Sequence, residues 1–402
     1  MKLQKNALLP MFTLSVLLAS SGCASSQAPS SHAQAMMHGA HGQAAEYQGH
    51  GKLPGLETQV MPLSAVQSLQ TLIDKLVNER VVFVGERHDD YTDHLNQLEI
   101  IRGLHERDIP LAIGVEFFQQ PFQHALDRYI SGEIDEKTFL IESEYFNNWR
   151  MDYQLYRPIM KYAQEHAIPV IALDIPRSIV RKVSREGLDS LTEEERALIP
   201  AEIDRSDERY RESLKQTFMQ HNLSEVDPEN FVKAQLVRDE VMAQRAVDYL
   251  KENPQHHMVI LAGEGHITYR SGIPNRLDRR LDTRSITILN NVHDTLPPDV
   301  ADYVLFSNPQ PMPRSGRLGI IMAENDEGVN IASFSPHASA AEAAGLKARD
   351  ILLEIEGSAI RTMADLKIAL MDKKPGDEVS VKALRKHWLV SDKELDLKIT
   401  LR

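Results

Sequence analysis

The sequence has a single cysteine, Cys23, and it lies close to the N-terminus. The rest of the chain therefore offers neither an intramolecular disulfide nor a thiolate ligand or nucleophile. Any metal or cofactor must be held by His, Tyr, Asp, Glu or Met side chains. Positive charge is also in short supply, because 45 Lys and Arg residues face 58 Asp and Glu, a formal net charge of -13. Since nucleic-acid-binding surfaces concentrate Lys and Arg, we expect no nucleic acid among the partners.

The N-terminal segment has the layout of a signal peptide. Lys2 and Lys5 precede an apolar run at residues 7–19, and small residues lead to Cys23. The run is too short for a transmembrane helix, which needs about 20 apolar residues. Residues 1–23 resemble a bacterial lipoprotein signal, although Ser20 departs from the leucine favoured there. The resemblance implies a mature N-terminus at an acylated Cys23, and an ordinary secretory signal is the alternative. Ala24 after the cysteine then implies a lipid anchor in the outer membrane, facing the periplasm.

Residues 24–54 have the composition of a flexible tether, rich in Ser, Ala, Gly, Gln and His. Its possible ligands for a transition metal are His32, Met36, Met37, His38, His41 and His50. The alternative is a solvated spacer that happens to be rich in histidine.

The chain after the tether predicts two domains, since 402 residues that are 42% hydrophobic can form more than one core. An amphipathic helix pattern at residues 69–76 comes before the first of several short apolar runs. These runs lie at residues 81–84, 111–115, 170–173, 258–261 and 286–289, with helical patterns between them. Such alternation predicts an α/β domain at residues 61–306, with a mainly parallel sheet flanked by helices. Three prolines at residues 307–315 break the periodicity and indicate a linker.

The C-terminal segment, residues 316–402, is expected to form a small β-rich domain. It contains the motifs Gly316-Arg317-Leu318-Gly319-Ile320, Ala348-Arg349-Asp350-Ile351-Leu352 and Pro375-Gly376-Asp377. Over its whole length it resembles the PDZ domains of bacterial proteases. The resemblance implies that the amides of Leu318, Gly319 and Ile320 hold the carboxylate of a peptide or protein C-terminus, which pairs with the strand edge. A PDZ fold used only as an interdomain or dimer contact is the alternative.

Polar residues follow the apolar runs of the first domain. Ligands of parallel sheets bind at the carboxyl ends of the strands, so these residues are the candidates for metal binding or catalysis. They are Glu86, His88, Glu116, Asp174, Glu264 and His266. Two Gly-x-x-His motifs begin at Gly85 and Gly263, where glycine is expected to let the backbone turn sharply. His88, His266 and Glu116 are a plausible ligand set for Zn or Mn, and hydrogen-bonded structural residues are the alternative.

Several motifs of the first domain occur together in one known family. They include Gly85-Glu86-Arg87-His88-Asp89, Gly114-Val115-Glu116-Phe117-Phe118, Tyr156-Arg157-Pro158-Ile159 and Gly263-Glu264-Gly265-His266. With them the chain resembles the ChaN-like haem-binding lipoproteins, relatives of the TraB and TIKI group. The resemblance implies haem or iron uptake and a homodimer with haem between its subunits. It further implies that a tyrosine holds the iron, while His and Lys of the partner meet the propionates.

The candidate haem ligands in this chain are Tyr153, Tyr156, His88 and His94. Tyrosinate is a known haem ligand, and tyrosines packed against the sheet are the alternative. The leading hypothesis is thus a haem-binding envelope lipoprotein whose PDZ domain recruits a partner, which needs no catalytic residue. The second hypothesis is a metal-dependent hydrolase in which Glu86 or Glu264 activates a metal-bound water. A third is a scaffold that works through its PDZ groove.

Overall fold

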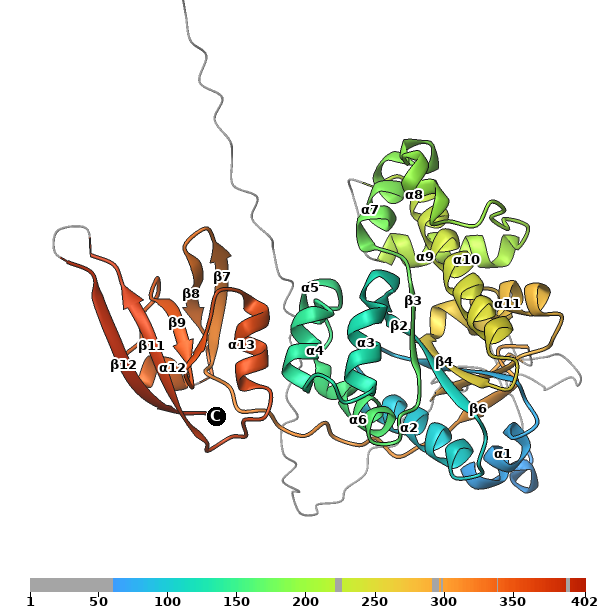
Figure 1. The fold of residues 1–402 in the computed structure, drawn as a ribbon, viewed down its shortest axis with the longest axis horizontal. Coiled ribbons are helices and arrows are strands. Elements are labelled where there is room, and N and C mark those ends of the chain that lie inside the picture. Colours follow the sequence, from blue (N-terminus) through green and yellow to red (C-terminus); the bar gives the residue numbers. More distant parts are fainter. Residues whose placement is uncertain (1–60, 221–225, 291–295, 298, 338, 388–390) are drawn as a thin grey trace, which may run out of the picture. The chain divides into compact units, whose positions relative to one another are not determined.

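The computed structural model describes residues 61–220, 226–290, 296–297, 299–337, 339–387 and 391–402 (Figure 1). The predicted signal peptide, Cys23 and the tether lie outside the described residues. Within the described ranges, no helix combines the length and the apolar character needed to cross a membrane.

The first sheet has six strands in the order β3-β2-β4-β1-β5-β6, and every neighbouring pair is parallel. The strands are β1 (Val81–Glu86), β2 (Leu111–Gln119), β3 (Val170–Asp174), β4 (His257–Gly263), β5 (Ile286–Asn290) and β6 (Tyr303–Leu305). Each predicted apolar run forms one of the strands β1 to β5, so the predicted parallel sheet is confirmed. The short strand β6 was not predicted, because three residues do not make a recognisable apolar run.

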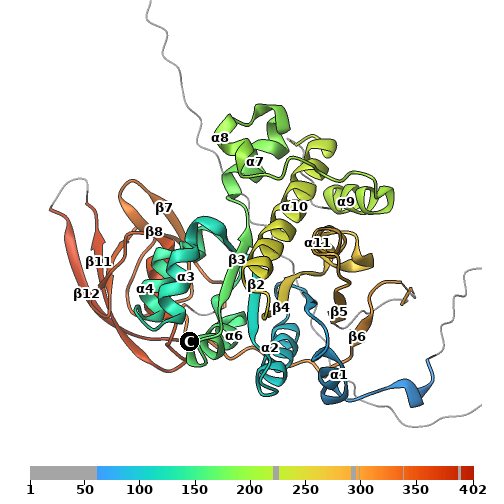
Figure 2. The same cartoon turned by 45° about the vertical axis from the view of Figure 1, so that its right-hand side comes forward.

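Strand β1 shows why these strands are apolar on both sides. Val82 and Val84 pack into one core cluster, whereas Val81 and Phe83 pack into another. All of its residues are buried. Neighbouring side chains of a strand point to opposite faces, so a sheet covered by helices on both faces needs continuous apolar runs. Figures 1 and 2 show helices on the two sides of this sheet.

The helices that contribute to the two core clusters divide between the two faces of the sheet. Helices α1 to α6 contribute to the cluster that contains Val82, and α10 and α11 to the cluster that contains Phe83. Helix α1 begins where the Ser68 side chain accepts a hydrogen bond from the Thr71 amide, and the predicted helix is confirmed. The helices are α1 (Leu69–Leu76), α2 (Tyr91–His105), α3 (Gln123–Ile130), α4 (Glu136–Glu142), α5 (Tyr145–Asn148), α6 (Arg157–Glu165), α7 (Arg177–Glu186), α8 (Glu193–Ala197), α9 (Glu208–Gln220), α10 (Pro228–Glu252) and α11 (Ile273–Leu281). The 3-10 helices are η1 (Leu63–Ala65), η2 (Gln120–Phe122), η3 (Tyr153–Leu155), η4 (Leu188–Ser190), η5 (Glu264–His266) and η6 (Thr268–Arg270).

The second sheet is antiparallel, in the order β12-β11-β9-β8-β7, and β10 pairs with β9. Its elements are β7 (Ile320–Asn325), β8 (Gly328–Phe334), α12 (Ala340–Ala343), β9 (Ile351–Ile355), β10 (Ser358–Ala359), α13 (Met363–Leu370), β11 (Glu378–Arg385) and β12 (Lys393–Thr400). The predicted β-rich C-terminal domain is therefore confirmed. Strand β7 is at an edge of this sheet, which leaves one side of its backbone unpaired within the sheet.

Candidate functional site

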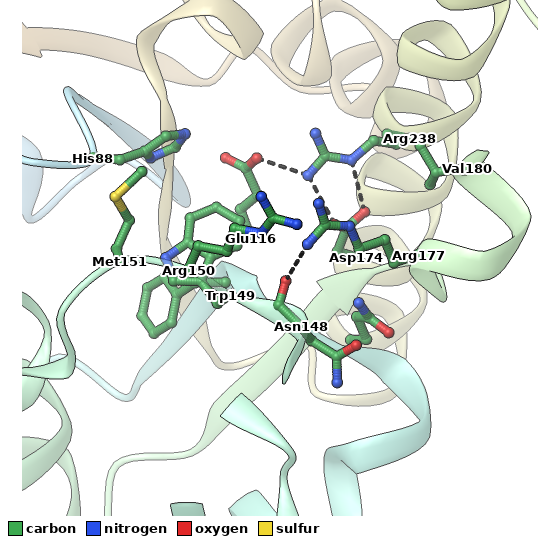
Figure 3. Close-up of a pocket in the computed structure, with 12 residues that line it drawn as sticks. His88, Glu116, Asn148, Trp149, Arg150, Met151, Asp174, Arg177, Val180 and Arg238 are labelled. Atoms are coloured by element: carbon green, nitrogen blue, oxygen red, sulfur yellow. Dashed lines mark hydrogen bonds and ion pairs between the residues drawn. The ribbon is translucent and has the colours of Figure 1, made fainter. Parts of the chain in front are cut away.

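A cavity of about 280 Å³ lies at the carboxyl edge of the first sheet (Figure 3). The parallel strands β1, β2 and β3 deliver predicted residues to it: His88 follows β1, Glu116 lies in β2 and Asp174 ends β3. The lining residues are His88, Glu116, Phe117, Gln119, Asn148, Trp149, Arg150, Met151, Asp174, Arg177, Val180 and Arg238. Glu264, also predicted from its place after a strand, is not among them.

Arg238 of α10 is one of several residues lining this site that were not predicted from the sequence, with Phe117, Trp149, Arg150, Met151 and Arg177. Its Nη2 donates to Glu116 Oε1 at 2.7 Å and to Asp174 Oδ2 at 2.8 Å (Figure 3). Its Nη1 lies 3.3 Å from Nε2 of His266. The signal in the sequence was a charged triplet, residues 238–240, inside an otherwise apolar stretch of a long helix. Charges that a helix buries must be paired, so such a triplet indicates a buried polar network.

The predicted Zn or Mn site at His88, His266 and Glu116 is not supported. Both oxygens of Glu116 are already bonded, Oε1 by Arg238 and Oε2 by the Gly263 amide at 2.8 Å. A permanently charged guanidinium thus lies where a metal ion would need the carboxylate. Throughout the described part of the chain, no group of three His, Cys, Asp or Glu side chains could hold a metal ion.

The charges at the base of the cavity compensate one another. Burial by itself raises the pKa of Glu116, but the cations His266 and Arg238 lower it to about 2. Burial raises the pKa of Asp174 even though Arg238 bonds to it. Nδ1 of His266 lies 2.6 Å from Asp239 Oδ1. Burial lowers the pKa of His266, yet the charges of Glu116 and Asp239 raise it overall. The buried arginine therefore has its counterions within the protein.

The side chain of His88 is partly exposed, and a buried carboxylate orients it. Its Nδ1 lies 2.9 Å from Oε1 of Glu86, while the exposed fractions are 32% for the His88 side chain and 1% for that of Glu86. The imidazole stands edge-on to Trp149, with ring centres 4.9 Å apart. Burial lowers the pKa of His88, but the bond to Glu86 and the charge of Glu116 raise it overall. Among the described residues, Nε2 has no hydrogen-bond partner and remains available.

Comparison with known proteins gives the family. The family model described as "Haem-binding uptake, Tiki superfamily, ChaN" matches residues 72–277, which is half of the chain. The chain belongs to the ChaN-like family. A PDZ domain model matches residues 316–401. The two parts are called the ChaN-like domain and the PDZ domain below.

Individual relatives are distant. "Protein RETICULATA-RELATED 5, chloroplastic" of Arabidopsis thaliana is 26% identical over 278 residues, 63% of this chain and 37% of that protein, so the match covers well under half of the relative. The solved structure "Cofacial heme binding to ChaN of Campylobacter jejuni" is 16% identical, with a TM-score of 0.49 over 59% of this chain and 91% of that chain. A serine endoprotease from Yersinia pestis is 23% identical over 22% of this chain and 28% of its own, with a TM-score of 0.18.

The other candidate haem ligands of the ChaN-like domain are buried and do not line the cavity. Tyr153 is 1% exposed and Tyr156 is fully buried, and the Tyr156 hydroxyl donates to Glu86 at 2.9 Å. Burial raises the pKa of both phenols well above 10. His94 is 1% exposed and lies against Glu86 and the backbone oxygen of His88. The structure therefore does not support the prediction that Tyr153, Tyr156 or His94 reaches a ligand in this cavity.

The glycines of the two Gly-x-x-His motifs serve close packing rather than a sharp turn. Gly263 has a φ of -55°, which any residue adopts. A Cβ atom there would lie 2.8 Å from Cε1 of His88, and a Cβ on Gly85 would lie 2.7 Å from Cδ2 of Leu289. The expectation of a special backbone conformation was wrong, because the glycines are needed for the space they leave.

In the PDZ domain, the three predicted peptide-binding residues lead into the edge strand β7. Gly319 has a φ of +71°, in the region that favours glycine. Leu318 is buried, and Ile320 begins the strand. Within the described residues, the amides of Leu318 and Gly319 donate no hydrogen bond. Free amides beside an open strand edge are the arrangement in which a peptide carboxylate binds.

Proposed function

We propose that this chain is a haem-binding protein of the cell envelope that holds haem at the cavity beside His88. The observation that carries the proposal is His88 itself, an imidazole with a free Nε2 in a cavity of a ChaN-like domain. Haem iron accepts imidazole ligands. A carboxylate on the second ring nitrogen, here Glu86, is the usual partner that orients a ligating histidine and raises its basicity.

The other walls of the cavity also fit haem. Phe117, Trp149 and Met151 provide apolar surface for a macrocycle, and Arg150 and Arg177 provide positive charge for its carboxylates. Bound haem would supply a redox-active iron. At about 280 Å³ the cavity is slightly smaller than typical small-molecule sites, which measure about 300–1,000 Å³, so it would enclose a haem only in part. A second subunit that covered the exposed part of the haem would give the proposed homodimer a physical reason. The family description supports the further proposal of a role in haem uptake.

The experiment for this proposal is a titration of the full chain with ferric haem, followed in the visible spectrum. We expect saturable binding with the spectrum of an imidazole-ligated iron. A chain that leaves the haem spectrum unchanged at all concentrations does not have the proposed function. The rival hypothesis is a metal-dependent hydrolase, whose predicted metal ligand Glu116 bonds to Arg238 in this structure.

We further propose that the PDZ domain recruits a partner through the C-terminus of a peptide or protein. Leu318, Gly319 and Ile320 would hold the terminal carboxylate, and β7 would pair with the peptide backbone. A peptide with a free carboxylate is expected to bind about tenfold more tightly than its C-terminally amidated form, because the amidated form cannot make the charge-assisted hydrogen bonds of the carboxylate. Fluorescence polarisation with a peptide library and its amidated copies measures this ratio. Equal binding of both forms would rule out carboxylate capture.

We also propose that Cys23 carries the lipid that anchors the protein to the outer membrane. The support is the order of charged, apolar and small residues before the only cysteine. In cells grown with labelled palmitate, the wild-type chain is expected to carry the label and Cys23→Ser to carry none. Cell fractionation shows whether the labelled chain is in the outer membrane. Equal labelling of the two chains would show that Cys23 is not the acylated residue.

A further inference from the structure

We infer that Arg150 and Arg177 form an anion-binding subsite at the cavity, which takes a carboxylate or phosphate group on a ligand with an apolar body. The inference rests on the proposed haem function for the identity of that body. Figure 3 shows both guanidinium groups at the same cavity as Arg238.

Of the three arginines that line the cavity, only Arg238 has an ion pair with a residue that the structure describes. Arg238 is paired with the two carboxylates at the base of the cavity, Glu116 and Asp174. Neither Arg150 nor Arg177 forms an ion pair with any described residue. The hydrogen bond of Arg177 goes instead to a neutral backbone oxygen, that of Asn148, at 3.3 Å. Two cations at this cavity thus lack an anionic partner within the described chain.

Both arginines lack an ion pair to the described residues although the protein has an excess of acidic residues, with which other arginines pair. Arg157, Arg270 and Arg276, for example, each pair with a carboxylate. At Arg177 the surroundings act against the charge: burial, and after it the neighbouring cations, which include Arg150, lower its pKa. A bound anion would supply the missing counter-charge to both side chains.

Arg177 lies at the start of a helix. It is the first residue of α7, and the first turn of α7 contains no acidic residue. The positive end of the helix dipole disfavours a cation there. An anion bound at Arg177 would offset this unfavourable interaction with the helix dipole.

The lining of the cavity indicates the class of ligand. The arginines share the cavity with Phe117, Trp149 and Met151, so a charged group and an apolar, flat body can be bound together. A haem carboxylate has this chemistry, and a phosphate offers the same contacts to the arginines. The apolar wall favours a ligand with a flat apolar body over free phosphate. We therefore assign the subsite to a haem carboxylate.

The test compares ferric haem, the dimethyl ester of the same haem and inorganic phosphate on the full chain. The variants are Arg177→Gln, Arg150→Gln and, as a matched control, Arg185→Gln, an exposed arginine on the same helix that does not line the cavity. We expect each cavity variant to lose about tenfold in affinity for haem and to leave the affinity for the ester unchanged. Arg185→Gln should bind like the wild type. Arg177→Gln should melt no lower than the wild type, since it removes an unfavourable charge from the helix start.

Each other outcome is decisive. If haem binds but the cavity variants lose haem and ester equally, or lose neither, the anion subsite is overturned while the haem function stands. If neither the wild type nor any variant binds haem, the proposed haem function is wrong. The effect of inorganic phosphate on the melting temperature then tests the anion subsite by itself. Phosphate that raises the melting temperature of the wild type and Arg185→Gln, but not of Arg177→Gln, then supports an anion site for phosphate. Phosphate that does not distinguish these chains overturns it.

Discussion

Replacing Arg238 with methionine is expected to destabilise the ChaN-like domain by about 3–5 kcal/mol. The side chain is 14% exposed and bonds to Glu116 and Asp174, which are themselves buried. Methionine keeps an unbranched apolar stem, which is shorter than that of arginine, and leaves two carboxylates without a counterion in a region of low dielectric. Chemical denaturation at neutral pH measures the change. Lys251→Met, an exposed change on the same helix, is the control and should stay within about 0.5 kcal/mol of the wild type.

A triple variant separates the loss of charge balance from the loss of packing. Adding Glu116→Gln and Asp174→Asn to Arg238→Met removes the unpaired negative charges and should recover part of the lost stability. If Arg238→Met alone is as stable as the wild type, the arginine is not the counterion that holds the base of the cavity together.

Replacing His88 with alanine is expected to abolish the imidazole-ligated haem spectrum. It should weaken haem binding by more than the roughly 10- to 100-fold that loss of an orienting partner costs at metal sites. Glu86→Gln, which removes such a partner, should fall within that range. His166→Ala is the matched control, because His166 is exposed and does not line the cavity. Unchanged spectra for His88→Ala, together with a changed spectrum for Tyr156→Phe, would return the ligand role to the tyrosine.

The same ligand predicts a pH dependence of haem binding. An imidazolium cannot ligate iron, so affinity should fall as pH drops through the pKa of His88. That pKa is raised above its ordinary value of 6.5, chiefly by Glu86 and Glu116 against the opposing effect of burial. The loss should therefore begin at a higher pH than for an isolated histidine. In Glu86→Gln the midpoint should move to lower pH, because one of the charges that raises the pKa is gone.

The sheet could be predicted because most of its strands are marked by a pattern of neighbouring residues in the sequence. Each of the strands β1 to β5 is a short apolar run, and a parallel order places their carboxyl ends together. His88, Glu116 and Asp174 could be assigned to one edge on that basis. The ion pair between Glu116 and Arg238 could not be predicted in this way, since Arg238 comes from a helix more than a hundred residues further along the chain.

The tyrosines show where sequence reasoning stops. Tyr153 and Tyr156 were attractive as ligands because their residue type suits ferric haem. Their burial depends on packing between η3, α6 and the sheet, which no local pattern specifies. Tyr153 lies in η3, and Tyr156 is the residue that precedes α6, so the two do not share one regular helix. Accessibility, rather than residue type, is what distinguishes His88 from them.

The central claim is that haem lies at the cavity with His88 on its iron, and a crystal structure of the haem-saturated full chain tests it most directly. The account predicts iron on Nε2 of His88, the macrocycle against Trp149 and Phe117, and a carboxylate at Arg177. Iron on Tyr153 or Tyr156, or haem bound at a site away from this cavity, would contradict it.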